Sequence, residues 1–441
     1  MHRVSLKLLY SEADIFWGKG SIMARFAASD WDKVFTELNR HQTSEQPYGL
    51  PERRVGSVVM SSFNIRTLGN PDTRTTTHDE GRTQGAWDLL ARYVSQCDLI
   101  AIQEVKDNLA GLIRLKDSLE ESDKYALVVS DVTGARPGLD ASQERLAYLY
   151  RWDRIERTEL ASDVSYDRRA VLQSLEDNHQ EFINSLDQYG VLLSDYKMQL
   201  REFENGHRPK KPNKPNLKPP AFLTFMRTPH VASFQVKSQG GARSLPFLAV
   251  NAHLLYGDSA SERKMEFDAL VDWLRWRTKS KERLYHKNMI LFGDLNLEFE
   301  KQFTSLEDAD QAIKDMNQDI GVGYKVNFPF LDVPDKRKPH PIGDGKGRYL
   351  TTARMTQTYD QIGLFGLSGA LPDHDANDLA GRTGSNGFDY GMFCFSDLFA
   401  KALHNEPSFL NMENLKTFVK RYNFDVSDHH PIWMRLPIPG T

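Results

Sequence analysis

At 441 residues, the chain is long enough to bury a substantial core in one large domain or in two. Its net charge of −4 argues against a protein that binds nucleic acid by overall positive charge, and leaves room only for a local basic patch. Two cysteines, Cys97 and Cys394, cannot form a disulfide framework, and free thiols suit a reducing compartment. No apolar run approaches the ~20 residues of a membrane span, and the N-terminus lacks the apolar core of a signal peptide. We therefore expect a soluble, cytoplasmic protein that makes no contact with a membrane.

The organised part of the chain begins at Val55. Residues 1–54 carry weak periodicity and no assignable motif beyond a short helix from Ser29 to Leu38, so we treat them as an N-terminal extension of unknown role. Apolar runs predict strands at residues 58–66, 98–105, 125–129 and 145–150. Helices are expected after the capping box that begins at Thr77, and again after Asp107 or Asn108.

Residues 163–206 interrupt this pattern as a helical insertion. From Leu172 to Phe203 the apolar residues recur at alternating three- and four-residue steps, broken only by His179. This heptad seam predicts a helix, which Gly190 weakens by about 1 kcal/mol relative to alanine. Two interpretations stay open. The seam packs on its own domain, or residues 172–203 contact a second copy of the chain or a partner protein.

Residues 207–220 follow as a basic, proline-rich linker. The linker contains five prolines, which keep it extended, and no acidic residue. Its cations are Arg208, Lys210, Lys211, Lys214 and Lys218. These charges are either simply solvated or in contact with phosphate groups, which Lys and Arg neutralise without regard to base sequence.

The second half of the chain returns to alternating strands and helices. Strands are expected at residues 221–225, 247–255, 289–292, 359–365 and 432–436, and helices from Ser261 and over residues 412–421. After the run at 289–292, Gly293 is expected to let the backbone turn sharply, and Asp294 and Asn296 then lie two residues apart. In extended chain that spacing places a carboxylate and an amide on one face, where they can orient water, a metal or a phosphate. A strand end followed by a simple turn is the alternative.

Polar residues recur at the ends of the expected strands. They are Asn64, Glu104, Glu144, His253, Asp294, Asn296, Asp360, Asp428 and His429. A sheet gathers such residues along one edge, and a set rich in carboxylates and amides suits a hard cation and a phosphate better than zinc or a thiol site. No glycine-rich phosphate loop and no Ser-His-Asp order competes with this interpretation.

With these residues the chain resembles the endonuclease/exonuclease/phosphatase superfamily, and most closely its DNase I-like branch. The matching motifs occur in the family's order: Ser62-Phe63-Asn64-Ile65-Arg66-Thr67, Ile102-Gln103-Glu104-Val105, Gln143-Glu144-Arg145, Asn251-Ala252-His253, Gly293-Asp294-Leu295-Asn296, Tyr359-Asp360-Gln361-Ile362 and Ser427-Asp428-His429-His430-Pro431. The resemblance implies an α/β fold, a four-layered α/β sandwich of two packed mixed β-sheets flanked by helices. This catalytic domain would span residues 55–437, interrupted by the insertion at 163–206 and the linker at 207–220.

The resemblance also implies metal-assisted hydrolysis of a phosphodiester. Glu104 would hold a divalent cation, Mg²⁺ or else Mn²⁺ or Ca²⁺, with Asp428 and Asn64 nearby. Asn64 and Asn296 would hold phosphate oxygens. Two further pairs are implied, and they join His253 to Glu144 and His429 to Asp360. A carboxylate partner fixes the imidazole tautomer and raises its pKa, so that His253 can protonate the leaving oxygen, while Asp294 or His429 activates water.

Two departures from the family bear on the substrate. Ser142 stands where DNase I-like enzymes carry a tyrosine that contacts DNA, and Lys106 replaces an arginine that reads the minor groove. Arg66 and Lys106 are then the candidate phosphate contacts. We expect an endonuclease that nicks DNA with little sequence specificity. The alternatives are a phosphatase or phosphodiesterase acting on a lipid or inositol phosphate, and a partner-binding module whose site is vestigial.

Overall fold

The computed structural model describes residues 25–40, 47–70, 81–134, 143–164, 168–237, 244–256, 260–279, 287–297, 311, 324–331, 349–367, 369–379, 388–413 and 415–438. The statements below concern these residues. Two of the sequence-based expectations, the capping box at Thr77 and the role of Ser142, lie outside them.

The described strands form two mixed sheets of six strands each. The first has the order β11-β12-β1-β2-β4-β3, and the second the order β5-β6-β7-β8-β10-β9. The bounds in the first sheet are β1 Ser57–Leu68, β2 Leu99–Val105, β3 Tyr125–Val129, β4 Arg145–Arg151, β11 Asp389–Met392 and β12 Ile432–Pro437. Those in the second are β5 Ile155–Asp163, β6 His230–Val236, β7 Leu245–His253, β8 Asn288–Asp294, β9 Tyr324–Asn327 and β10 Asp360–Leu367. Each sheet has one parallel pair at its centre, β1 with β2 and β7 with β8.

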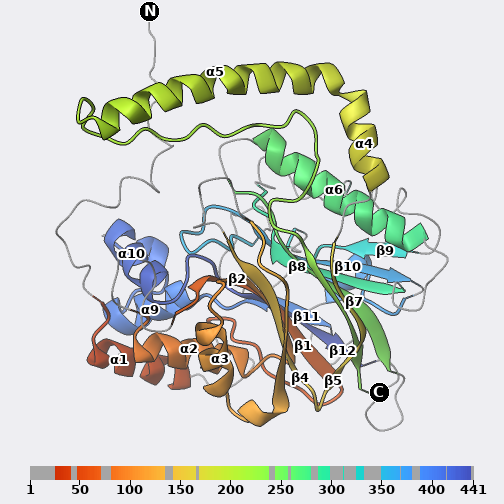
Figure 1. Cartoon of the computed structure of the whole chain (residues 1–441). Coiled ribbons are helices and arrows are strands. Elements are labelled where there is room, and N and C mark those ends of the chain that lie inside the picture. The colour runs from red at the N-terminus through yellow and green to blue at the C-terminus, as the bar shows by residue number, and fades with distance from the viewer. Residues whose placement is uncertain are drawn as a thin grey trace, which may run out of the picture.

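Helices cover the outer face of each sheet, as Figure 1 shows. They are α1 Ala28–Arg40, α2 Gln84–Val94, α3 Ala110–Asp117, α6 Ala260–Lys279, α9 Phe395–His404 and α10 Leu415–Asp425. Short 3₁₀ helices lie at Ser122–Lys124, His374–Leu379 and Phe409–Asn411. Helix α6 buries Leu270 and Leu274 in a core cluster with Leu291 of β8. The predicted four-layered α/β sandwich is confirmed.

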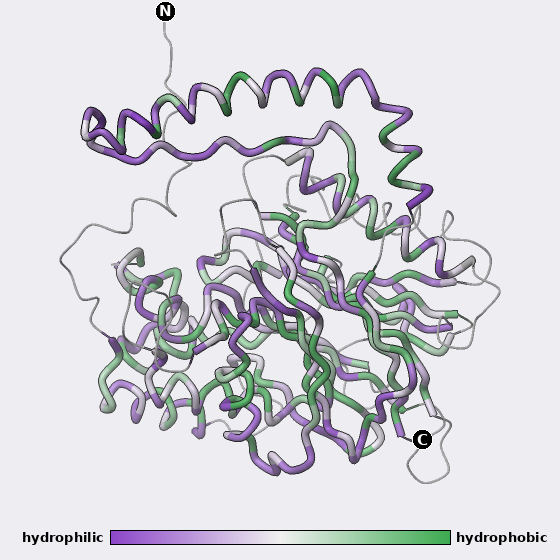
Figure 2. The backbone as a smooth tube through the Cα atoms, in the orientation of Figure 1, coloured by the Kyte–Doolittle hydropathy of each residue, from purple (hydrophilic) through white to green (hydrophobic). Residues whose placement is uncertain are grey.

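Burial on both faces explains why the central strands are apolar almost throughout. In β8 every residue is buried, and in β1 only the stretch after Ile65 approaches solvent. Figure 2 shows the hydrophobic residues concentrated in the sheets and the hydrophilic ones on the segments around them. Aromatic rings join the two sheets: Phe234 of β6 lies 5.4 Å from Tyr148 and 5.3 Å from Tyr150 of β4, measured between ring centroids.

The region before residue 55 contributes to this same core. Trp31 of α1 and the preceding Phe26 are buried against Phe399 of α9, with ring centroids 5.3 Å and 4.8 Å away. The expected helix from Ser29 to Leu38 is therefore present as α1 and covers one side of the domain.

Several sequence-based expectations of secondary structure were wrong. Residues 221–225 were expected to form a strand, but they are irregular, and their aromatic side chains Phe222 and Phe225 pack on the second core cluster instead. The strands β5, β6, β9 and β11 were not anticipated. In β5, an edge strand, only Ile155 is buried, so its sequence is too polar to produce an apolar run. The helix expected after the capping box is present as α2, which begins at Gln84, and the Thr83 side chain accepts a hydrogen bond from Ala86 N.

The heptad-patterned insertion forms two helices, α4 Arg168–Asp177 and α5 His179–Glu204, separated at Asn178. Residues 207–220 return alongside α5 in extended conformation (Figure 1). The Ser185 hydroxyl donates to Lys218 O at 2.6 Å, and Pro212 is buried. The half-buried side of α5 contains the heptad residues Phe182, Tyr189, Leu193, Tyr196, Leu200 and Phe203. The contact of residues 172–203 with a second copy or a partner protein stays a prediction.

Among the described residues, no helix has the length and apolarity needed to cross a membrane.

Gly293 does not turn the chain, as its sequence context suggested, but lies inside β8. It pairs with Ala252 of β7 on one side and Gln361 of β10 on the other. A Cβ atom at this position would lie 2.1 Å from Ala252 O, so any side chain would push the central strands apart. The glycine is required by the close approach of β7.

We expect Gly293→Ala to lower the free energy of unfolding by about 1–3 kcal/mol, because overpacking at a central strand forces the backbone to shift. Urea unfolding measures this change. Gly190→Ala is the matched control, since a Cβ there meets nothing within 4 Å and alanine favours the helix. Equal midpoints for Gly293→Ala and the wild type would contradict the close-approach explanation.

Candidate active site

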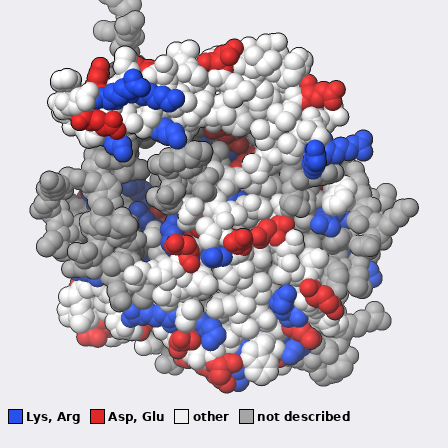
Figure 3. Space-filling model, viewed as in Figure 1, with Lys and Arg blue, Asp and Glu red and all other residues white. Residues whose placement is uncertain are grey.

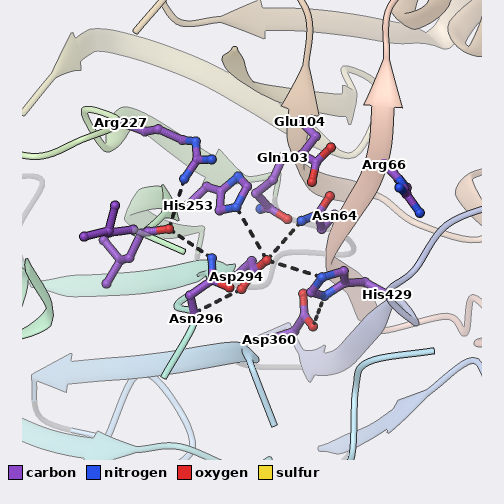
Figure 4. Close-up of polar contacts among 12 residues, drawn as sticks. Asn64, Arg66, Gln103, Glu104, Arg227, His253, Asp294, Asn296, Asp360 and His429 are labelled. Carbon is purple, nitrogen blue, oxygen red and sulfur yellow. Dashed lines mark hydrogen bonds and ion pairs between the residues drawn. The ribbon is translucent and has the colours of Figure 1, made fainter. Parts of the chain in front are cut away.

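Polar residues at the ends of the central strands of both sheets lie close together. His253 ends β7, Asp294 ends β8 and Asp360 begins β10, and these three residues are neighbours in strand register. The facing sheet contributes Asn64 from β1 and Glu104 from β2, and His429 lies just before β12. Figure 4 shows these side chains converging between the sheets. The structure thus brings together residues that are far apart in the sequence.

Asp294 lies at the centre of this cluster and is fully buried. Its Oδ2 atom accepts a hydrogen bond from Asn64 Nδ2 at 3.0 Å across the two sheets. The same oxygen lies 3.6 Å from His253 Nε2 and 3.5 Å from His429 Nε2. Both separations exceed an ordinary hydrogen bond, so the two imidazoles face the carboxylate at a distance that suits a shared water or substrate oxygen.

Each imidazole is held from behind by a second carboxylate. His253 Nδ1 lies 2.5 Å from Glu144 Oε1, and His429 Nδ1 lies 2.7 Å from Asp360 Oδ2. A carboxylate at Nδ1 keeps the proton on that nitrogen and leaves Nε2 directed at Asp294. Burial lowers the pKa of His429, but the carboxylates of Asp360 and Asp294 outweigh burial and raise this pKa well above its ordinary value. These carboxylates therefore favour the protonated form of His429.

Asn296 reaches the site by a turn, which corrects the expectation that extended chain would align it with Asp294. The strand ends at Asp294, and Asn296 has a left-handed backbone with φ 49°. Its N–H donates to Asp294 Oδ1 at 3.0 Å, and its Nδ2 donates to Leu254 O at 2.9 Å. One amide hydrogen is thus used to fix the side chain, and the other is left to donate to a ligand.

Glu104 occupies a strained position at a bulge in β2. Its φ of 60° is left-handed, a conformation that costs a residue with a Cβ roughly 1 kcal/mol or more. The register of β2 against β4 shifts at this point, and Glu104 Oε2 accepts a hydrogen bond from Thr67 N at 2.8 Å. Burial raises the pKa of the Glu104 carboxyl, but Lys106, His253, the Thr67 amide and Arg66 together lower it to about 2. The carboxylate is therefore ionised and held in place.

Two sets of residues fit a divalent cation. In the set expected from the sequence, Asn64 Oδ1 and Asp428 Oδ1 are buried oxygens with no hydrogen-bond partner among the described residues, and Glu104 supplies an ionised carboxylate. The second set is Asp294, Asp360 and His429, whose ligand atoms lie within 4.8 Å of one another. In the second set, His429 Nδ1 and Asp360 Oδ2 already bind each other, which leaves fewer free donors. The first set is the more oxygen-rich, as Mg²⁺ and Ca²⁺ prefer.

Arg227 is a site residue that the sequence did not reveal. Its Nε lies 2.7 Å from Glu144 Oε1, and its Nη1 donates to Leu254 O at 3.1 Å. Leu254 O is also the acceptor of the Asn296 amide, so one guanidinium supports both the His253 pair and Asn296. Arg227 belongs to an irregular segment without a motif, and no sequence signal indicates its partner.

Two hydroxyl groups were also missed. The Thr351 hydroxyl donates to Asp360 Oδ2 at 2.6 Å, beside His429. The Ser427 hydroxyl donates to Asn64 O at 2.7 Å and accepts from Arg66 N at 3.1 Å. Ser427 directly precedes Asp428 in the recognised motif, which was the one available signal.

The two candidate phosphate contacts border the carboxylates. The exposed Arg66 guanidinium lies 3.5 Å from Asp428 Oδ2, and this carboxylate raises the pKa of Arg66. Lys106 is half-buried, and its charge is the largest influence that lowers the pKa of Glu104. Both cations therefore lie beside the oxygen-rich set, where a phosphate would be attracted.

Comparisons with known proteins give the following similarities. No family model matches the chain. A deoxyribonuclease of Thioalkalivibrio sp. (strain K90mix) is 26% identical over 250 residues, which cover 56% of this chain and 48% of that protein. Deoxyribonuclease gamma of Rattus norvegicus is 25% identical over 96 residues, covering 22% of this chain and 28% of that protein. The chain thus spans about half the length of the first relative and less of the second.

Among solved structures, an endonuclease/exonuclease/phosphatase family protein from Bacteroides thetaiotaomicron aligns with 86% of this chain and 97% of its own. The aligned residues are 14% identical, and the TM-score is 0.41. The sandwich architecture itself is established by the strand pairings described above.

Proposed function

We propose that this chain is a member of the endonuclease/exonuclease/phosphatase superfamily, similar to its DNase I-like branch, and that it is a divalent-metal-dependent endonuclease that nicks DNA with little sequence specificity. The observation that carries the proposal is the buried Asp294 carboxylate with one carboxylate-backed imidazole on either side. Such a group can take a proton from water on one side and give one to a leaving oxygen on the other. The similarity to deoxyribonucleases supports DNA as the substrate.

Each residue of the site has one role in the proposed hydrolysis. His253, oriented by Glu144, protonates the oxygen that leaves the phosphorus, and Asp294 removes a proton from the attacking water. His429 is not the base, because Asp360 and Asp294 favour its protonated form by raising its pKa. The free amide hydrogens of Asn64 and Asn296 donate to phosphate oxygens, where negative charge builds up as water attacks. Arg66 and Lys106 hold the neighbouring phosphates by charge.

A divalent cation, Mg²⁺ or else Mn²⁺ or Ca²⁺, would be held by Glu104, Asp428 and Asn64. The bound cation would supply neutralisation of the charge on the phosphate. The buried oxygens of Asn64 and Asp428 without hydrogen-bond partners support this assignment, because a buried acceptor without a donor is costly unless an ion satisfies it.

We also propose a cytoplasmic location. Cys97 and Cys394 are both buried and free, so the described fold does not depend on a disulfide bond.

A substrate panel tests the proposed function. Purified chain is given Mg²⁺, Mn²⁺ or Ca²⁺ and offered supercoiled plasmid, single-stranded RNA, inositol phosphates and phosphoinositide vesicles. We expect nicked plasmid and no released phosphate. Phosphate release from the inositol compounds with intact plasmid would favour the lipid or inositol phosphatase alternative, and no turnover of any substrate would favour a binding module with a vestigial site.

Arg227 is proposed as a positioning residue for the Glu144–His253 pair. Arg227→Gln should lower kcat about 10–100-fold with little change in KM, as is usual when the partner of a catalytic group is lost. Arg227→Lys should restore only part of the rate, since an ammonium lacks the planar fork that reaches both Glu144 and Leu254 O.

The matched control for Arg227 is Arg154→Gln. Arg154 Nε lies 2.8 Å from the buried Asp98, so this variant also breaks a pair between an arginine and a buried carboxylate, but just before the start of β2, at the opposite end of that strand from Glu104. It should lose stability and keep kcat. If the two glutamine variants lose stability equally and both keep kcat, Arg227 has only a structural role.

A further inference from the structure

We propose that the basic strip, defined as Arg208, Lys210, Lys211, Lys214 and Lys218 of the returning segment 207–220, binds the phosphodiester backbone of a nucleic acid outside the active site. The inference rests on the proposed function and adds a second contact surface to it. The partner is a long polyanion. The strip therefore raises the affinity for long substrates and leaves the rate of the chemical step unchanged.

The basic strip is ordered before any ligand arrives. Five prolines restrict the segment to extended conformations, and α5 holds it at both ends. His207 N donates to Glu202 O at 2.8 Å, and the Ser185 hydroxyl donates to Lys218 O at 2.6 Å. Pro212 is buried between these two anchors. A pre-extended row of cations loses little backbone freedom on binding, which favours affinity.

The cationic side chains of the strip reach the surface of the molecule. Its four lysines are exposed, and Arg208 is half-buried. Within the described part of the chain, Arg208, Lys210, Lys211 and Lys218 form no ion pair, although the adjacent α5 carries Glu202 and other carboxylates. Figure 3 shows Lys and Arg side chains gathered on the insertion, with Asp and Glu beside them, at the end where α5 is followed by the returning segment. Four cations without an ion pair, in a chain of net charge −4, form a local site for an anion.

The strip is tied to the active site through a short stretch of chain. Phe225 is buried in the second core cluster, and Arg227 contacts Glu144. Lys218 precedes Arg227 by nine residues, which span at most about 32 Å. Duplex DNA rises ~3.4 Å per nucleotide, so a strand of roughly ten nucleotides covers the greatest separation that this stretch allows between the site and Lys218. Substrates longer than this should therefore reach the strip from the active site.

The test compares two triple variants of the full chain. Lys210→Gln/Lys211→Gln/Lys218→Gln removes charge from the strip, and Lys33→Gln/Lys325→Gln/Lys401→Gln removes the same charge from α1, β9 and α9. Each is assayed with a 30-nucleotide DNA, a 4-nucleotide DNA and bis(p-nitrophenyl) phosphate. Binding of the 30-nucleotide single strand is measured by fluorescence anisotropy over a range of salt concentrations.

We expect the strip variant to raise KM and Kd for the 30-nucleotide DNA at least tenfold, with unchanged turnover of the two small substrates. Its slope of log Kd against log salt should be smaller by ~2, since each phosphate contact contributes ~0.7 for a single strand. Equal slopes and equal KM values for the two triple variants would overturn the inference, as would equal binding of a polyglutamate peptide by the wild type. Failure of the proposed function can be told apart from failure of this inference. If the proposed function is wrong, the wild type cleaves none of the three substrates, but fluorescence anisotropy still measures whether the strip variant binds the 30-nucleotide DNA more weakly.

Discussion

Replacing His253 by alanine is expected to lower kcat for plasmid nicking by about 10²–10⁴-fold, the usual contribution of a positioned general acid. His253 Nε2 faces Asp294 and its Nδ1 lies 2.5 Å from Glu144, so this imidazole is held in place to give a proton on its own side of Asp294, opposite His429. Nicking rates at saturating plasmid and fixed Mg²⁺ measure the effect.

The leaving group separates an acid from a merely structural histidine. With bis(p-nitrophenyl) phosphate, whose leaving oxygen needs no protonation, His253→Ala should lose far less activity than with DNA. His230→Ala is the matched control, because His230 is also buried and its Nδ1 lies 2.7 Å from a carboxylate of Asp163, yet it does not face Asp294. If His253→Ala nicks DNA as fast as the His230 variant, the nuclease mechanism fails.

Glu104→Gln should reduce activity by at least about 100-fold, since removing a partner of a metal ligand alone costs 10–100-fold. Glutamine keeps the size of the side chain and can still accept the Thr67 N–H, but it loses the charge that a cation requires. The Mg²⁺ concentration that gives half-maximal rate should rise in parallel, and isothermal titration calorimetry should show weaker binding of Mg²⁺.

The control for Glu104 is Glu120→Gln, an exposed glutamate paired with Arg92 on the surface. This variant should keep both the rate and the Mg²⁺ dependence. A Glu104→Gln protein with unchanged Mg²⁺ dependence would move the cation to the alternative set of Asp294, Asp360 and His429.

The sequence predicted the central strands and the residues at their ends because burial on both faces leaves apolar runs in β1, β2, β7, β8 and β10. The same argument failed for β5 and β9, which lie at the edges of the second sheet and carry shorter or more polar sequences. Residues 221–225 contain as many apolar residues as a strand, but the aromatic side chains anchor an irregular segment that follows the linker.

Site residues could be recognised from the sequence only where they adjoin an apolar strand. His253, Asp294 and Asp360 were recognisable because each ends or begins an apolar strand, and register then places them side by side. The left-handed backbones of Glu104 and Asn296 were not recognisable, since neither residue is a glycine and no local pattern demands φ above zero. Arg227 was missed because its partner, Glu144, comes from a distant segment that only the fold brings near.

The most direct test of the account is the conversion of supercoiled plasmid to open circles by the wild type and by Asp294→Asn, each with Mg²⁺ and with a chelator. Asparagine preserves the size of the central side chain and removes the charge that both imidazoles face. We expect rapid nicking by the wild type with Mg²⁺, none with the chelator, and a rate at least about 10²-fold lower for Asp294→Asn. Nicking by Asp294→Asn at the wild-type rate, or by the wild type in the presence of the chelator, would contradict the account.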